Sequence, residues 1–335
     1  MSKAADLART ASASETALGS RNKVINGAMT LDQRNAGTVT VNSTVYTIDR
    51  WQANQTTAGK FSVGKSTTAP TGFTNSYLAT SLSAYSVLSS DIFFFQQNIE
   101  GNNVANLAWG TASAKTITLS FWVRSSLTGT FGGSLANAAH NRSYPFSYTI
   151  STADAFEYKT VTITGDTAGT WATDNTTGMQ VIFGIGGGAS RSGTAGSWQA
   201  ATLYTATGAT SVVGTSGATF YITGVQLESG TVATPFEHRS YGEELALCQR
   251  YYQTGVADFR SGSSGAESFV SSTKFIREMR AIPTTAYTAA ASATANVSGT
   301  PSPVALSTNT LRLTVYSAAG GDVYYVRNFS LSAEL

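Results

Sequence analysis

Aromatic side chains set among hydroxyl and amide groups are the feature of this sequence that most suggests chemistry. Trp122 stands on the polar face of the alternating segment KTITLSFWVR (115–124), and Trp109 and Trp198 stand in or next to glycine-rich stretches. A flat aromatic ring with a few polar neighbours can stack on the C–H face of a sugar. We therefore predict glycan stacking at Trp109, Trp122 and Trp198. The alternative is that these rings pack beneath loops, because tryptophans are highly buried on average.

Catalytic and metal-binding constellations are not evident in the sequence. The two histidines, His140 and His238, have no cysteine or histidine partner at metal-ligand spacing. The chain lacks the G-x-S-x-G turn of a serine hydrolase, and nothing marks the carboxylate pair that a glycosidase needs. We therefore expect no enzymatic activity, no metal ion and no cofactor.

A glycine-rich run, MQVIFGIGGGA (179–189), contains a partial match to the dinucleotide-binding fingerprint. The fingerprint requires a helix to begin at its last glycines, whereas the following SRSGTAGS (190–197) is typical of a loop. We predict a strand over 179–183 and a flexible glycine loop after it.

The composition combines few charges with much glycine. Charged residues make up 12% of the 335 residues, about half of the usual share, and hydrophobic residues make up 41%, which suffices for packed cores. A net charge of +2 without a Lys/Arg cluster argues against a nucleic-acid partner. No apolar run approaches the roughly 18 residues of a membrane-spanning helix, and we expect no signal peptide. The single cysteine, Cys248, excludes an intrachain disulfide and fits synthesis in a reducing cytosol.

Alternating apolar residues predict an all-β protein. In the segment 115–124, the four apolar residues at 117, 119, 121 and 123 share one face of a strand. Further segments with strand patterning are 38–49, 92–95, 144–150, 157–164, 200–204 and 220–228. Since no internal repeat is visible, these strands predict a jelly-roll β-sandwich over 22–236.

Two shorter regions complete the β architecture. Residues 1–21 are rich in alanine and serine and predict a short N-terminal arm that attaches to a partner, the alternative being a flexible terminus without such a role. Strand patterns at 268–279, 311–316 and 323–331 predict a small C-terminal β-sandwich module over 254–335. A module of this length has a thin core and often needs a partner.

A linker helix is predicted over 237–253, between the two β regions. Ser240 and Glu243 have the spacing of a capping box, in which each side chain bonds the other's backbone N–H. An apolar stripe with helical spacing follows, and a second apolar face lies beside it. The residues of the stripe are Tyr241, Leu245, Cys248 and Tyr252. We predict that this stripe lies in a domain or oligomer interface.

The helix region also carries a family resemblance. EHRSYGEELALCQRYY (237–252), with ITGVQLESGTVATPF (222–236) before it, resembles a segment common in tail-fibre and other virion structural proteins of tailed bacteriophages. Three further segments look like the same family: KVINGAMTLDQRN (23–35), YTIDRW (46–51) and SFWVRSS (120–126). TKFIREMRAIPT (273–284) is similar to the start of the small C-terminal module in those proteins. The β parts also look like carbohydrate-binding jelly rolls.

The resemblance implies a structural component of a virion appendage, a homotrimer whose sandwich attaches to host-surface polysaccharide. Residues 1–21 would bind other virion proteins, and assembly would take place in the host cytoplasm. The family supplies no catalytic residue. Long fibres of this kind carry an extended shaft, whereas only about 20 residues precede the sandwich here. We therefore expect a short fibre, a fibre tip or another decorating subunit.

A tail fibre or receptor-binding protein is the function that we predict from the sequence. A head fibre or capsid decoration protein is the main alternative, and the sequence does not separate the two. A glycan depolymerase is a third possibility, disfavoured because the chain has neither long repeats nor a marked carboxylate pair.

Overall fold

The computed structural model describes residues 21–287, 293–299, 301 and 303–335. The chain divides between Arg239 and Ser240 into two compact units, which we call the N-terminal unit and the C-terminal unit. The attachment arm predicted for residues 1–21 lies, except for its last residue, outside the described residues. No helix in the described part of the chain is long and apolar enough to cross a membrane.

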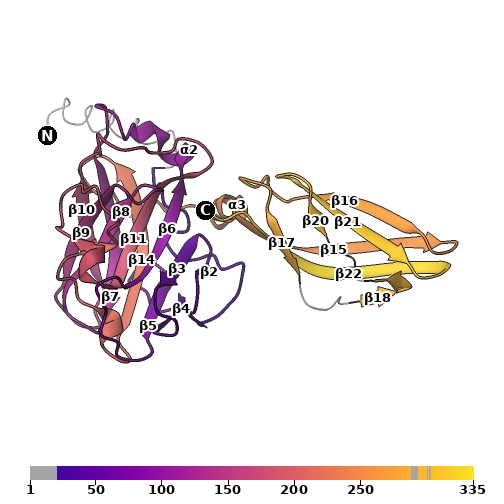
Figure 1. Cartoon of the computed structure of the whole chain (residues 1–335), viewed down its shortest axis with the longest axis horizontal. Coiled ribbons are helices and arrows are strands. Elements are labelled where there is room, and N and C mark those ends of the chain that lie inside the picture. The colour runs from indigo at the N-terminus through magenta and orange to yellow at the C-terminus, as the bar shows by residue number, and fades with distance from the viewer. Residues whose placement is uncertain (1–20, 288–292, 300, 302) are drawn as a thin grey trace. The chain divides into compact units, whose positions relative to one another are not determined.

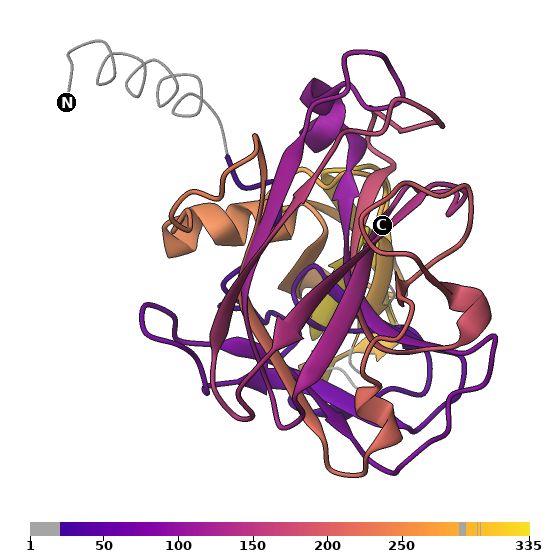
Figure 2. The same ribbon diagram turned by 90° about the vertical axis from the view of Figure 1, so that its left-hand side faces the viewer.

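Two six-stranded antiparallel sheets make up the N-terminal unit (Figure 1). The first sheet has the strand order β1 (Val39–Thr40), β4 (Phe61–Ser66), β5 (Ser76–Ser81), β14 (Thr219–Ser229), β7 (Ile117–Ser125) and β10 (Glu157–Ile163). The second sheet has the order β2 (Val45–Ile48), β3 (Trp51–Gln55), β6 (Ile92–Glu100), β11 (Thr177–Gly187), β8 (Gly129–Ala136) and β9 (Ser143–Ile150). Figure 2 shows these strands from the left-hand side of Figure 1. The predicted jelly-roll sandwich is confirmed.

Short elements connect the strands of this sandwich. They are the helix α2 (Gly101–Val104), the 3-10 turns η1 (Ala105–Leu107), η2 (Ala189–Arg191) and η3 (Val212–Gly214), and the parallel pair β12 (Ser192–Gly193) and β13 (Thr205–Ala206).

Aromatic rings fill the space between the two sheets. Trp51, Phe95 and Phe183 are fully buried, and their ring centroids lie 5.6–6.3 Å apart. The apolar face predicted for 115–124 points into the same core. Since burial of one large apolar side chain contributes about 1.5–3 kcal/mol, this core holds the two sheets together.

A small sandwich forms the β part of the C-terminal unit, as predicted. One sheet has the order β15 (Tyr252–Ser263), β22 (Gly321–Ser332) and β17 (Thr284–Tyr287), with β18 (Ala293–Ala295) also paired to β22. The other has the order β16 (Ser268–Lys274), β21 (Thr310–Ser317) and β19 (Val297–Ser298), with β20 (Val304–Ala305) also paired to β21. Its core is divided into two small clusters of buried residues.

The helix α3 (Tyr241–Gln249) is shorter than the predicted helix over 237–253. Its capping box is present: the Ser240 hydroxyl accepts from the Glu243 backbone N–H at 3.3 Å, and the Glu243 carboxylate accepts from the Ser240 N–H at 3.0 Å. Residues 237–239 are not helical and belong to the N-terminal unit, in which the side chains of Glu237 and Arg239 bond to the backbone near Asn22. Glu237 accepts from the Asn22 backbone N–H at 2.6 Å.

The apolar stripe of the helix ends one turn earlier than its spacing predicts. The backbone N–H of Tyr251 bonds to the carbonyl oxygen of Cys248, and the chain then turns into β15. Tyr252 is therefore the first residue of a strand, paired with Ser332, and not a helical residue.

Candidate functional site

Two of the tryptophans predicted to stack on a glycan, Trp109 and Trp198, lie in one cluster with a third, Trp171. The three rings pack edge-to-face, with ring centroids 4.8–5.5 Å apart. Each indole N–H donates to a backbone carbonyl oxygen nearby. Trp109 is only 7% exposed, whereas Trp198 is half-buried. A sugar can therefore stack on Trp109 only if a neighbouring ring moves, and the glycan contacts of Trp109 and Trp198 stay predictions.

Trp122 lies on the outer face of the first sheet, as its strand pattern predicts, and is half-buried. Its cross-strand neighbour is the exposed Tyr158 of β10. The two ring centroids are 5.4 Å apart and the ring planes are inclined by 48°. This pair offers an aromatic surface to a ligand, so the glycan contact of Trp122 also stays a prediction.

A row of side-chain amides crosses the outer face of the second sheet. Gln52 of β3 lies opposite Gln96 of β6, and Asn98 of β6 lies opposite Gln180 of β11. The Gln96 amide nitrogen donates to the Gln52 oxygen at 2.9 Å and to the Asn98 oxygen at 3.0 Å. We call these four residues the amide row. Gln96 and Asn98 lie on the outer face of β6, because the residues that alternate with them along the strand, such as Phe93 and Phe95, point into the core.

A column of aromatic rings stands beside the amide row. The ring of Tyr204 lies 4.9 Å from that of Phe94 and stacks on the imidazole of His140 at 5.2 Å. Phe94 is buried, while Tyr204 and His140 are half-buried. We call these three residues the aromatic stack. It joins a strand of the second sheet to two loops that are far apart in the sequence.

Two buried polar atoms of this face have no hydrogen-bond partner among the described residues. They are the side-chain oxygen of Gln96 and Nε of Arg191, whereas the side chain of Gln180 is hydrogen-bonded to His140. Gln96 and Gln180 are only 5% and 7% exposed. A buried polar group without a partner costs about 1–3 kcal/mol, and such groups in a native protein call for a physical explanation. A ligand that supplies a missing partner is one, and it reaches these covered atoms only when a neighbouring side chain moves aside.

The electrostatics of the aromatic stack keep its imidazole neutral. Burial and the positive charge of Arg191 lower the pKa of His140 from its ordinary value of 6.5, and the side chain of Gln180 opposes this effect. Burial likewise raises the pKa of Tyr204, against the effect of the Arg191 charge. At neutral pH, His140 and Tyr204 therefore present uncharged polar groups.

Two glycines, Gly132 of β8 and Gly184 of β11, leave room for the segment that contains Thr205 to approach the same face of the sheet. We call this pair the glycine bed. A Cβ at Gly184 would lie 2.8 Å from Cβ of Thr205, and one at Gly132 would lie 2.5 Å from Oγ1 of Thr205. The flexible glycine loop predicted after residue 183 is therefore wrong, because β11 continues to Gly187. The glycines are needed for space: they admit β13 and, with it, the neighbouring Tyr204 of the aromatic stack.

None of the seven residues of the amide row and aromatic stack is among those predicted to bind a ligand. The strand prediction at 92–95 ended before the residues that matter, whereas β6 runs to Glu100. The sequence QQN at 96–98 continues the alternation of the strand, with Gln96 and Asn98 on one face. That continuation was the one available signal of a polar outer face.

The predicted interface residues are distributed over two elements of the C-terminal unit. Tyr241 is exposed and Leu245 half-buried on α3, while Cys248 is buried. Tyr252 is half-buried on β15. Their role in an oligomer stays a prediction.

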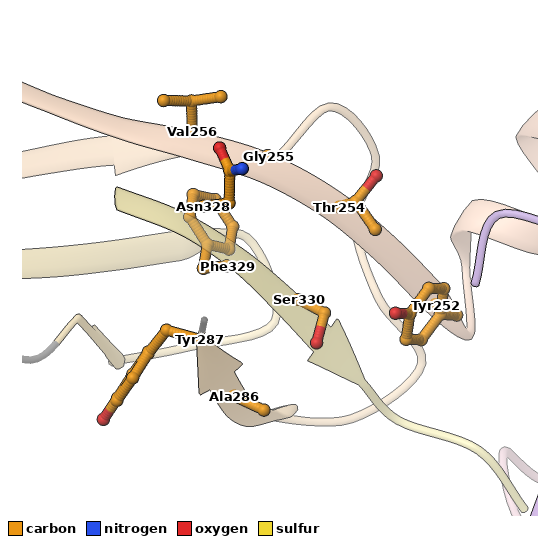
Figure 3. A pocket seen from close by; sticks show the side chains of 9 residues that line it. All are labelled: Tyr252, Thr254, Gly255, Val256, Ala286, Tyr287, Asn328, Phe329 and Ser330. Atoms are coloured by element: carbon orange, nitrogen blue, oxygen red, sulfur yellow. The ribbon is translucent and has the colours of Figure 1, made fainter. Parts of the chain in front are cut away.

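An open pocket of about 560 Å³ lies on the sheet of β15, β22 and β17 (Figure 3). It is lined by Thr254, Val256, Asn328 and Ser330, and by Tyr287 of strand β17. Its lining is mixed and carries no charged side chain. In the described part of the chain, no group of three or more His, Cys, Asp or Glu residues is arranged to hold a metal ion.

Comparisons with known proteins return structures only. No protein-family model matches the sequence, and no curated protein matches it. A putative sugar-binding protein from Bacteroides thetaiotaomicron is similar with a TM-score of 0.37 and 12% identity, over 62% of this chain and 100% of that one. A family 11 carbohydrate-binding module from Clostridium thermocellum, in complex with a β-1,3-1,4-mixed-linked tetrasaccharide, is similar with a TM-score of 0.30 and 13% identity, over 57% and 97%. Similarity at these values assigns no role to any residue of this chain.

Proposed function

We propose that the N-terminal unit binds a glycan on the outer face of its second sheet. The observation that carries the proposal is the meeting of the amide row, with its unpartnered Gln96 oxygen, and the aromatic stack, whose Tyr204 and His140 are half-buried. Sugar hydroxyl groups donate and accept hydrogen bonds, and sugar C–H faces pack on aromatic rings. A glycan therefore offers both kinds of contact that this face presents.

The arrangement favours binding over catalysis. The four amides and the neutral imidazole can donate and accept hydrogen bonds, but neither the row nor the stack contains a carboxylate to act as general acid or nucleophile. We propose a binding protein that leaves its glycan intact.

A glycan array tests this proposal. We expect the full chain to bind a defined subset of glycans, and the Tyr204→Ala variant to lose at least about tenfold in affinity, as expected for loss of a stacking contact and its packing. The matched control is Tyr221→Ala, which removes a half-buried aromatic ring from the first sheet. Equal loss in both variants, or loss only in Tyr221→Ala, would contradict the placement of the site. Absence of binding to any glycan would contradict the function.

For the biological setting, we propose a structural virion protein of a tailed bacteriophage, either a tail fibre or a receptor-binding protein that attaches to host-surface polysaccharide. The support is the resemblance carried by residues 222–252 together with the composition. Residues 1–21 would attach the chain to other virion proteins. Antibody labelling of particles in electron micrographs tests the setting. Signal at the tail is the expected result, signal at the head would indicate a head fibre or decoration protein, and unlabelled particles would contradict both.

A further inference from the structure

An arginine without a partner borders the proposed glycan site. Arg191 is the last residue of η2 and is half-buried. Its Nε atom is buried and has no hydrogen-bond partner among the described residues. Its charge is close enough to His140 and Tyr204 to affect both of their pKa values. The guanidinium therefore belongs to the surroundings of the aromatic stack.

The backbone around Arg191 is held in place on both sides. The Arg191 N–H bonds to the carbonyl oxygen of Gly188 at 2.9 Å, and the Arg191 carbonyl oxygen accepts from the N–H of Tyr204 at 2.9 Å. Ser190 adds two bonds to the carbonyl oxygen of Ser89, from its N–H at 3.0 Å and its hydroxyl at 2.6 Å. This fixed backbone keeps the root of the arginine side chain beside the site before any ligand arrives.

Two other arginines of the sandwich differ from Arg191 in having a carboxylate partner, although Nε of Arg124 is likewise buried without a hydrogen-bond partner. Arg142 makes a two-pronged contact with Asp166, at 2.7 and 2.6 Å. Arg124 pairs with Asp154 at 3.0 Å. The carboxylate that neutralises each of these two arginines therefore belongs to the protein itself. A half-buried guanidinium without such a partner can bind a carboxylate of a ligand, because its parallel N–H groups match the two oxygens.

We infer that the glycan bound on the second sheet is acidic, and that Arg191 receives the carboxylate of a uronic-acid type sugar placed against Tyr204 and His140. This inference rests on the proposed glycan-binding function and narrows its substrate class. The amide row binds hydroxyl groups, which all sugars have. Arg191 adds a positive charge, which favours a sugar that bears a carboxylate over a neutral sugar.

Affinity for matched pairs of polysaccharides tests the inference. The probes are oligosaccharides of hyaluronate, polygalacturonate and alginate, each compared with its carboxyl-reduced neutral form in titration calorimetry on the full chain. We expect at least one acidic form to bind and its reduced form to bind at least about tenfold more weakly, as loss of a charge-assisted bidentate contact implies. Arg191→Gln should abolish the preference and Arg191→Lys should retain part of it. The matched control Arg124→Gln should leave the preference unchanged.

The outcomes separate the two claims. Equal affinity for acidic and reduced forms, a preference for reduced forms, or a preference that survives Arg191→Gln would overturn the acidic class and leave glycan binding intact. No binding to any probe or to any glycan of the array would overturn both. A thermal melt of Arg191→Gln that matches the wild type would confirm that the variant is folded, as expected for a side chain without internal partners.

Discussion

Individual side chains of the aromatic stack combine burial with the capacity to change charge. His140 is the clearest case, because burial and the neighbouring Arg191 charge lower its pKa in the folded protein. In the unfolded chain its pKa returns to an ordinary value of about 6.5. The unfolded state therefore binds a proton at a pH at which the folded state does not. Linkage then requires that acidification favour unfolding.

We expect the free energy of unfolding of the N-terminal unit to fall as pH is lowered from 7 through 6.5 toward the depressed pKa of folded His140. Below that pKa both states bind the proton, so the decrease in unfolding free energy that His140 causes is complete. Urea unfolding at pH 7 and pH 5 measures the change. The variant His140→Gln should show a smaller decrease over this interval, because it has no imidazole to protonate. An identical decrease in wild type and variant would assign the pH dependence to other groups.

At the scale of elements, the approach of β13 to β11 depends on the glycine bed. A Cβ at Gly184 would be 2.8 Å from the Thr205 Cβ, closer than atoms can pack. We expect Gly184→Ala to destabilise the N-terminal unit by about 1–3 kcal/mol, the usual cost of overpacking. The double variant Gly184→Ala/Thr205→Gly should recover part of that loss, which chemical denaturation would measure as a coupling energy.

Gly214 provides the control for that cycle. The nearest atom to a Cβ at Gly214 would be 3.4 Å away, so Gly214→Ala should change stability little. Strict additivity of the Gly184 and Thr205 substitutions would show that the two residues do not contact each other as the structure has them.

The cap of α3 sets the stability of the only long helix in the described residues. Ser240→Ala removes the hydroxyl that accepts from the Glu243 N–H. We expect a loss of about 1 kcal/mol from the C-terminal unit, measured by urea unfolding against the exposed-strand control Ser272→Ala. Equal stability of the two variants would mean that the cap does not contribute.

The elements differ in how far the sequence predicted them. The face of the strand 115–124 was predictable because the side of each residue follows from period-two alternation alone. The capping box was predictable because both partners lie within four residues. The glycine run was misjudged, because glycine has a low strand propensity and only packing against Thr205 explains its place in β11.

The candidate site was not predictable, because its residues meet only through the pairing of distant strands. Gln52, Gln96 and Gln180 become neighbours in the order β3–β6–β11, which no local pattern specifies. The tryptophan cluster shows the converse. Its indoles stand in sequence surroundings that suit a sugar, yet Trp109 packs against Trp171 and Trp198.

For the molecule as a whole, exposed apolar side chains are concentrated in the C-terminal unit. Among the described residues this unit carries eight of the twelve large exposed ones, although it is the smaller unit. They are Tyr241, Val256, Val270, Ile276, Ile282, Val304, Leu306 and Tyr316. These side chains are the candidates for the subunit interface of the homotrimer that the family resemblance implies.

We expect light scattering at micromolar concentration to give three times the chain mass of 35.0 kDa. The variant Val270→Asp/Ile276→Asp should shift the protein toward monomer, because burying an unpaired charge at an interface is costly. Leu88→Asp is the control, since Leu88 of the N-terminal unit is 63% exposed and Val270 is 62% exposed. A monomer mass for the wild type would refute the trimer.

The central claim is that the glycan lies on the outer face of the second sheet. A crystal structure of the full chain with a glycan selected on the array tests this most directly. We predict sugar hydroxyl groups at hydrogen-bond distance, about 2.7–3.2 Å, from the amides of Gln96 and Gln180, with a sugar ring against Tyr204. A glycan bound instead on the Trp122–Tyr158 pair, or in the pocket of the C-terminal unit, would contradict it.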